Sequence, residues 1–220
     1  MVRPSAILTR IKRRLSPTDR EFRRIWPRVN EIPGFLVSPA QERWLFGTAR
    51  ALRDGAVIVE IGSFKGRSTA CLAYGCQGSQ KHVFAMDTFE GNDKDMSSGT
   101  LFEQNFYPAF RDNIEANGLG RYVTPIVGRS VDIGKTWSKP IDFLFIDGGH
   151  EYEDVLADFE TFSPHVVVGG IVAFHDCHNF ETDPNAPVGF PGVVRVWREN
   201  AVPVLSERGM CATLAYGTKR

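Results

Sequence analysis

Residues 145–176, FIDGGHEYEDVLADFETFSPHVVVGGIVAFHD, contain the pattern that decides the fold. An apolar run over Ile141–Ile146 leads into this stretch and ends in an acid, two glycines and a histidine. A predicted helix follows over Tyr152–Phe162. The apolar run Val166–Phe174 then contains a turn and a strand that ends in a histidine and an aspartate. A strand, a helix and a further strand in this order predict one unit of a parallel sheet.

Apolar runs and helical stretches also alternate through the first half of the chain. Near-continuous apolar strands of this kind are typical of a parallel sheet that is buried on both faces. The predicted strands cover Ala56–Ile61, His82–Asp87 and Tyr122–Val127, and the predicted helices cover Ser38–Arg53, Arg67–Tyr74 and Leu101–Asn117. Ser38 is placed to cap the first of these helices, and Gln41 is placed to complete a capping box.

The last part of the chain has a different pattern. Two apolar segments, Val202–Leu205 and Cys211–Tyr216, are separated by the turn-like residues Ser206–Gly209. This arrangement predicts an antiparallel hairpin at the end of the sheet. The predicted fold class is therefore α/β, with a mostly parallel seven-stranded sheet, an antiparallel last strand and helices on both faces.

Length and charge limit the function. A chain of 220 residues is long enough for one domain with a sizeable core. The formal net charge is zero, which argues against a general nucleic-acid-binding protein.

The sequence divides into two parts. Residues 1–34 form a predicted basic helical extension, and residues 35–220 form the main domain. Four residues of the extension fall near one side of a helix, which favours packing on the domain or on a second subunit over contact with an anionic membrane. They are Ile7, Leu8, Ile11 and Leu15.

The chain lacks the usual marks of secretion. No uninterrupted apolar segment resembles a signal peptide or a membrane span. The four cysteines form no CxxC pair and are too few for a disulfide scaffold, which favours reduced thiols in a cytoplasmic protein.

Polar residues end every predicted strand of the parallel sheet. Ligands bind at the carboxyl ends of such strands, so these residues are the candidates for a site. The five strand ends read EIGSFKGRST (60–69), DTFEG (87–91), GRS (128–130), DGGH (147–150) and HDCH (175–178).

The glycine turn after the first strand limits the class of ligand that the site can bind. Gly62 and Gly66 are four residues apart, so the turn is neither a GxGxxG fingerprint nor a P-loop. A turn of this kind suits a nucleoside without a pyrophosphate. Asp87 ends the second strand, where an acid accepts hydrogen bonds from ribose hydroxyls. The alternative is that Asp87 only forms a turn.

Three of these segments together resemble a known family. EIGSFKGRST, FAMDTFEG and the stretch 145–176 are similar to class I S-adenosylmethionine-dependent methyltransferases. The resemblance covers residues 35–216 and is closest to a branch of sugar O-methyltransferases of antibiotic and cell-surface glycan pathways, several of them magnesium-dependent. It implies a Rossmann-like sheet whose last strand is antiparallel.

The resemblance also implies roles for particular residues. The methyl donor would be bound mainly by the turn after the first strand and by the ends of the next strands, with Asp87 on its ribose. The methionine end would meet Glu60, Gly62, Ser63 and Ser68, the adenine would lie beside Arg129 and Ser130, and Gly66, Thr88 and Asp147 complete the set.

A metal site is implied next to the donor. Related metal-dependent enzymes hold Mg²⁺ with an acid after the fourth strand and an acidic pair after the fifth, positions that match Asp147, His175 and Asp176. The histidine departs from this pattern, because imidazole prefers softer metals. A buried histidine that only closes the strand is the alternative for His175. A zinc site with Cys177 and His178 is disfavoured, because no second pair of ligands lies nearby in sequence.

His150 is the predicted general base. A neutral imidazole can accept the proton of a substrate hydroxyl at physiological pH, and a metal at Asp147 would help by lowering the pKa of that hydroxyl. The alternative for His150 is a turn residue that bonds a backbone carbonyl.

The sequence as a whole predicts a methyltransferase that acts on a hydroxyl of a sugar or glycosylated small molecule. We expect S-adenosylmethionine as the methyl donor, Mg²⁺ as an assisting metal ion and no nucleic-acid partner. A homo-oligomer is compatible with the sequence. The alternatives are a catalytically silent cofactor-binding scaffold and a nicotinamide-dependent oxidoreductase, which the absence of GxGxxG disfavours.

Overall fold

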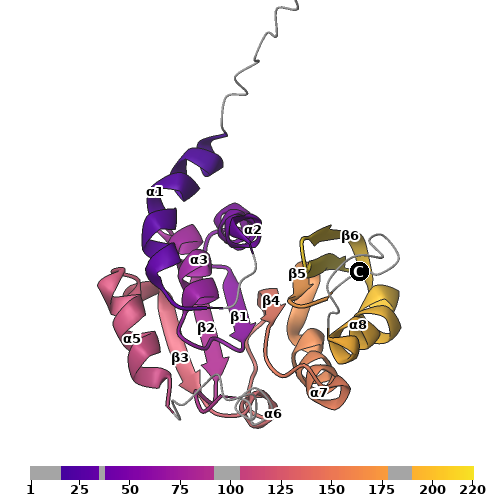
Figure 1. Cartoon of the computed structure of the whole chain (residues 1–220). Helices are drawn as coiled ribbons and strands as arrows, with labels where there is room; N and C mark the ends of the chain where they lie inside the picture. Colours follow the sequence, from indigo (N-terminus) through magenta and orange to yellow (C-terminus); the bar gives the residue numbers. More distant parts are fainter. Residues whose placement is uncertain (1–15, 35–37, 92–104, 178–189) are drawn as a thin grey trace, which may run out of the picture.

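The computed structural model describes residues 16–34, 38–91, 105–177 and 190–220. Within them, one seven-stranded sheet has the order β3-β2-β1-β4-β5-β7-β6 (Figure 1). The strands are β1 (Val57–Ile61), β2 (His82–Asp87), β3 (Val123–Val127), β4 (Ile141–Ile146), β5 (Val166–Phe174), β6 (Leu205–Cys211) and β7 (Leu214–Lys219). β1 to β5 pair in parallel, while β7 pairs antiparallel with both β5 and β6. The predicted mostly parallel sheet with an antiparallel last strand is confirmed.

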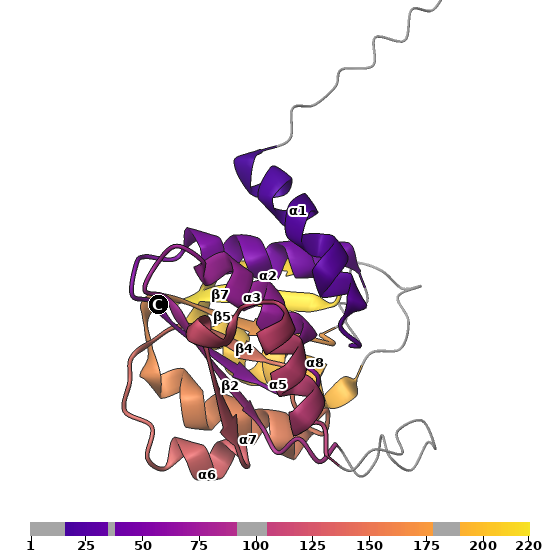
Figure 2. The same ribbon diagram turned by 90° about the vertical axis from the view of Figure 1, so that its left-hand side faces the viewer.

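Helices cover both faces of this sheet, as predicted (Figures 1 and 2). The described α-helices are α1 (Pro17–Glu31), α2 (Pro39–Ala51), α3 (Arg67–Cys76), α5 (Tyr107–Ala116), α6 (Ser130–Gly134), α7 (Tyr152–Phe162) and α8 (Pro191–Val196). Of these, α1, α2, α3 and α5 pack on one face of the sheet, and α7 and α8 pack on the other.

The central strand β4 shows why the sheet needs two helical layers. All six of its residues are buried. Phe143 and Phe145 belong to the hydrophobic cluster with α1, α2, α3 and α5, while Leu144 and Ile146 belong to the cluster with α7 and α8. Because side chains alternate along a strand, a strand that is apolar at nearly every position must be covered on both sides.

The first helix is part of this core. Its Ser16 N-cap and Asp19 form a capping box, and Phe22 and Val29 are buried in the cluster around α2 and α3. The apolar positions that were predicted to line a helix before residue 16 lie outside the described residues.

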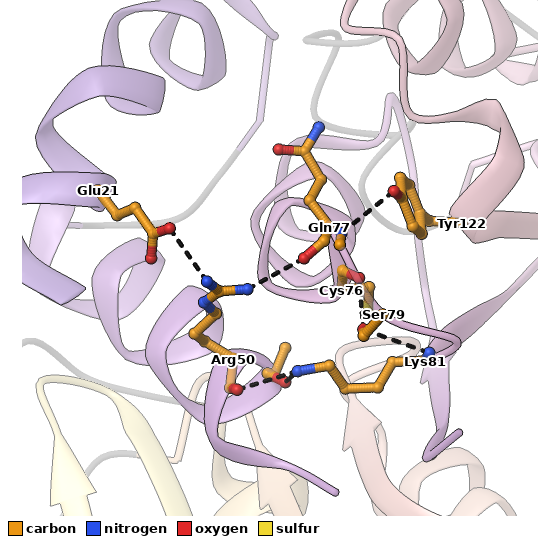
Figure 3. Close-up of polar contacts among 9 residues, drawn as sticks. Glu21, Arg50, Cys76, Gln77, Ser79, Lys81 and Tyr122 are labelled. Atoms are coloured by element: carbon orange, nitrogen blue, oxygen red, sulfur yellow. Dashed lines mark hydrogen bonds and ion pairs between the residues drawn. The ribbon is translucent and has the colours of Figure 1, made fainter. Parts of the chain in front are cut away.

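Polar contacts join the C-terminal end of α2 to the residues between α3 and β2 (Figure 3). The buried ammonium of Lys81 donates to the carbonyls of Ala49 and Arg50, each at 2.9 Å, where the last turn of α2 leaves carbonyls without helical partners. The guanidinium of Arg50 donates to the carbonyl of Gln77 at 3.0 Å and pairs with Glu21 at 3.2 Å. One cluster thus ties α1, α2 and the end of α3 together.

Three details of the sequence prediction are wrong. Val202–Leu205 was predicted as a strand, but Val202–Val204 form a 3-10 helix and β6 begins at Leu205. Ser38 is the N-cap of α2 but makes no side-chain capping bond, and Gln41 does not complete a capping box, because its amide donates to Thr213 at 2.7 Å. The final turn lies at Ala212 and Thr213, since Cys211 pairs with Leu214.

The segment that was predicted to be this turn lies inside β6. The pairing register shifts between Ser206 and Gly209, which makes the segment a bulge. The polar residues in it reflect this irregular edge strand and not a chain reversal.

The predicted turn inside the fifth apolar run is present as a bulge. β5 pairs with β4 at Val166 and again at Ile171, and Gly169 between them has a positive φ of 80°. None of the helices in the described ranges is both long enough and apolar enough to cross a membrane.

Candidate active site

The candidate site lies at the carboxyl ends of β1, β2, β4 and β5, which are neighbours in the sheet. The strand ladder continues one residue beyond these ends, because Gly62 donates to Met86, Asp147 to Ile61 and His175 to Ile146. The strand order reverses between β1 and β4, which is where ligands bind in open α/β sheets.

Two acids and two histidines meet after β4 and β5. Nδ1 of His175 lies 2.9 Å from Oδ1 of Asp147 and 3.3 Å from Oδ2 of Asp176, and Nε2 of His150 lies 3.2 Å from the same Oδ2. His175 is almost fully buried, whereas the other three side chains are partly accessible. The structure therefore brings together all four predicted catalytic and metal residues, His150, Asp147, His175 and Asp176.

Charges within this cluster shift the pKa values. Burial on its own would lower the pKa of His175, but the neighbouring Asp147 and Asp176 outweigh it and raise that pKa to about 10. Burial would raise the pKa of Asp176, but its bonds to His150 and His175 hold the pKa below its usual range. The cluster therefore holds a buried positive imidazole between two carboxylates when no other cation is present.

The same atoms fit a divalent cation. Asp147, His175 and Asp176 each offer one ligand atom, and these atoms lie within 4.8 Å of one another. Ligands in neighbouring positions of an octahedron with bonds of about 2.1 Å are about 3 Å apart, which is close to the separations of 2.9 and 3.3 Å from His175 to the two acids. Two carboxylates and one imidazole suit Mn²⁺ or Fe²⁺ at least as well as Mg²⁺.

Asp87 organises the turn after β1. Its Oδ2 accepts hydrogen bonds from the backbone N–H groups of Ser63 and Phe64, and its Oδ1 accepts one from Phe89, all at 2.7 Å. Asp87 therefore forms turn contacts, as its second interpretation expected, and these contacts leave the ribose-binding interpretation open. A carboxylate has about four acceptor positions, so one remains for a ligand hydroxyl.

Glu60 lies below this turn inside β1, completely buried. Its Oε2 accepts hydrogen bonds from the hydroxyls of Ser63, at 2.8 Å, and Thr69, while its Oε1 has no partner among the described residues. Burial is the main cause that raises the pKa of Glu60 to about 7. An unpaired buried carboxylate oxygen fits a cationic ligand group, such as the ammonium of a methionine-like ligand.

The turn itself needs glycine and strained backbone. Gly62 and Gly66 have φ values of 85° and 90°, and a Cβ on Gly62 would lie 2.0 Å from the carbonyl oxygen of Asp147. Phe64 also has a positive φ, of 45°. Gly62 therefore serves close packing between the turn after β1 and the start of the loop after β4.

The third loop of the site is tied down by a carboxylate that the sequence did not single out. The hydroxyl of Ser130 donates to Asp158 on α7, which is buried beside Gly148. Burial is the main cause that raises the pKa of Asp158 to about 6. Arg129 is exposed, and Thr88 accepts a long hydrogen bond of 3.4 Å from Glu90.

Two residues of the site carry no signal in the sequence. Acidic side chains on a helix such as α7 are usually solvated, and no local pattern predicts the burial of Asp158, because its partner Ser130 lies 28 residues away. Phe190 was also missed, although its ring stacks on His150 with ring centroids 3.7 Å apart. An isolated phenylalanine before a short helix carries no sequence pattern that would identify it.

Comparison with known proteins identifies the family of the chain. A family model for a methyltransferase domain matches residues 59–177. The chain is 30% identical over 160 residues to the uncharacterized protein y4gI of Sinorhizobium fredii, which covers 72% of this chain and 16% of that protein. An uncharacterized protein of Acanthamoeba polyphaga mimivirus is 26% identical over 134 residues, covering 60% and 56%. The chain thus spans less than two thirds of the length of either relative.

Solved structures share the fold. The O-methyltransferase from Bacillus cereus in complex with S-adenosylhomocysteine is 22% identical, with 93% of each chain covered and a TM-score of 0.61. CalS11, a TDP-rhamnose 3′-O-methyltransferase of calicheamicin biosynthesis, is 16% identical, with 93% of this chain and 95% of that chain covered and a TM-score of 0.57. Since the methyltransferase-domain family model matches more than half of the chain, this chain belongs to that family.

Proposed function

We propose that the chain is an S-adenosylmethionine-dependent O-methyltransferase whose acceptor is a hydroxyl of a sugar-containing small molecule. One observation carries this proposal. The glycine turn after β1 and the acid–histidine cluster after β4 and β5 lie at the same edge of the sheet, with Gly62 against the backbone of Asp147. A donor on the turn would present its methyl group to an acceptor beside His150.

The donor would be held by the loops after β1, β2 and β3. The Oε1 of Glu60, which has no partner among the described residues, suits the donor's ammonium group, and the remaining acceptor position of Asp87 suits a ribose hydroxyl. Ser130 would lie beside the adenine. The N-terminal turn of α3, which begins at Arg67, follows directly and favours the donor's carboxylate through its backbone N–H groups.

His150 would act as the general base. Its Nε2 faces Asp176 at 3.2 Å, so a proton on Nε2 makes Nδ1 the basic nitrogen. The acceptor oxygen forms a bond to the methyl carbon while the bond from that carbon to sulfur breaks, and the electron pair stays on sulfur in S-adenosylhomocysteine. The acceptor's proton passes to His150, and Asp176 stabilises the resulting imidazolium.

Asp147, His175 and Asp176 would hold a divalent metal. Such an ion lowers the pKa of an acceptor hydroxyl and orients it. Support for a sugar acceptor comes from the shared fold of CalS11, which is a TDP-rhamnose 3′-O-methyltransferase, and from the resemblance of the sequence to sugar O-methyltransferases.

Calorimetry on the full chain tests the donor. We expect S-adenosylhomocysteine to bind with micromolar affinity and NAD to bind far more weakly. Tighter binding of NAD, or no binding of S-adenosylhomocysteine by folded protein, would refute the proposal.

Substitution of His150 tests the base. His150→Ala should lower turnover by about 100-fold or more, because general base catalysis contributes about that factor, and should leave the affinity for S-adenosylhomocysteine within about twofold. His165→Ala is the matched control, since His165 precedes β5 at the opposite edge of the sheet. An equal loss of turnover and donor affinity in His150→Ala would mean that His150 is structural.

A further inference from the structure

The start of α8 contacts the segment that carries His150 at three points. The first is the stack of the Phe190 ring on the His150 imidazole, with ring centroids 3.7 Å apart and planes 16° from parallel. This is closer than the other aromatic contacts between described residues, whose centroids lie 4.6–6.5 Å apart. A near-parallel stack at this distance leaves the imidazole little freedom to rotate about its bond to Cβ.

The second contact is between backbones. A Cβ on Gly192 would lie 2.5 Å from the carbonyl oxygen of His150 and 2.5 Å from the nitrogen of Tyr152. Only glycine permits this approach, since Cβ atoms do not occur that close to backbone atoms. The position of α8 is therefore fixed relative to the His150 backbone as well as to its side chain.

The third contact extends the interaction by one helical turn. The guanidinium carbon of Arg195 lies 3.9 Å from the ring centroid of Tyr152, and Glu199 holds the same guanidinium at 3.0 Å. Val193, between the two contacts, is buried and lines the narrow crevice that Asp147, His150 and His175 also line.

Core packing does not account for Phe190. Its side chain is 39% exposed, and it belongs to neither hydrophobic cluster. Its closest aromatic neighbour among the described residues is an imidazole whose Nε2 also meets Asp176. His150 is thus held on its face by Phe190 and at its edge by Asp176, two residues from opposite ends of the segment between β5 and α8.

We propose that Phe190 is a positioning residue, which holds the His150 imidazole in the plane that directs Nε2 to Asp176. Gly192 makes this possible by letting the start of α8 approach the backbone of His150. The inference rests on the proposed function in that His150 is taken to be the base. Phe190 contacts the base and neither the donor nor the acceptor in this scheme.

Proton NMR of the histidine ring tests the position directly. The wild-type protein should show the His150 ring protons shifted upfield by the stacked ring, assigned by their absence from His150→Ala among the five histidines of the chain. Phe190→Ala should move them downfield, and Phe190→Tyr, which keeps an aromatic ring, should restore the wild-type shift. Identical His150 shifts in wild type and Phe190→Ala would overturn the proposal.

Kinetics tests the consequence. Phe190→Ala should lower kcat about 10-fold, while the affinity for S-adenosylhomocysteine stays within about twofold, and Phe190→Tyr should recover most of kcat. Val204→Ala is the matched control, because Val204 is 45% exposed and directly precedes β6, which begins toward the edge of the sheet opposite the site. An unchanged kcat in Phe190→Ala, or a Phe190→Tyr variant as slow as Phe190→Ala, would overturn the positioning role. Absence of methyl transfer by the wild-type chain would instead refute the proposed function. The NMR comparison would then still show whether Phe190 fixes the position of the His150 imidazole.

Discussion

Replacement of Glu60 by glutamine should remove one contribution to the way stability depends on pH. Glu60 is completely buried, and its pKa is raised from 4.5 to about 7 mainly by burial. The folded protein therefore keeps this proton up to about pH 7, whereas the unfolded chain loses it near pH 4.5. The stability that Glu60 contributes is fully present below pH 4.5 and is lost as the pH rises through 7.

The size of the effect follows from the two pKa values. A difference of one pKa unit corresponds to about 1.36 kcal/mol, so the loss between low and high pH is about 3 kcal/mol. Glu60→Gln keeps the shape of the side chain and an oxygen that accepts from Ser63 and Thr69. Because the amide cannot ionise, the variant should not suffer this loss.

Urea denaturation at several pH values measures the difference. The free energies of unfolding of wild type and Glu60→Gln should agree within about 1 kcal/mol at about pH 5, and the variant should be more stable by about 3 kcal/mol at about pH 8.5. The difference between the two proteins cancels the other groups that titrate in this range, including Asp158. A difference that stays constant across this pH range would refute the reasoning.

Three further predictions concern the packing of α2 and α3 and the metal. Glu42 is fully buried and accepts from Arg67 at 2.6 Å, so Glu42→Gln should lower the free energy of unfolding by about 3–5 kcal/mol in urea denaturation. A Cβ on Gly75 would lie 2.7 Å from the carbonyl oxygen of Phe46, so Gly75→Ala should cost about 1–3 kcal/mol, measured as a lower Tm. Dialysis against EDTA should abolish turnover, and Mg²⁺ or Mn²⁺ should restore it in wild type but not in Asp176→Asn.

Each of the three has a matched control or a contrary outcome. Asp112→Asn breaks an exposed pair with Arg111 and should leave stability unchanged. Gly47→Ala in α2 meets only Thr18 Cγ2 at an ordinary 3.7 Å, so it should stabilise the helix by up to about 1 kcal/mol. Stability losses as large in these controls as in the test variants would contradict the packing arguments. Full turnover in EDTA would remove the metal from the mechanism.

The sequence was sufficient for most of the fold and for the cluster of acids and histidines. The strand β4 and the helix α7 lie at the predicted residues, because a run of apolar residues and a helical period are local properties of the chain. Asp147, His175 and Asp176 come together because each follows the end of a strand, and neighbouring parallel strands end at the same edge.

Contacts between distant segments were not predictable in this way. Gln41 was expected to cap its own helix, but its amide finds Thr213 at the other end of the chain. The ion pair between Arg67 and Glu42 and the stack of Phe190 on His150 likewise join residues that no periodic pattern connects. These contacts depend on how the helices pack on the sheet. Helix packing is set by tertiary structure and cannot be read from a local sequence pattern.

The place of β7 in the sheet has a consequence for biosynthesis. β7 is translated after β6 yet lies between β6 and β5, so the free edge of β5 stays open until Lys219 has left the ribosome. At roughly 5–20 residues per second, the nascent polypeptide exposes an apolar edge for several seconds. Molecular chaperones that bind extended hydrophobic segments would find their target during this interval, and the Gln41–Thr213 bond could form only at its close.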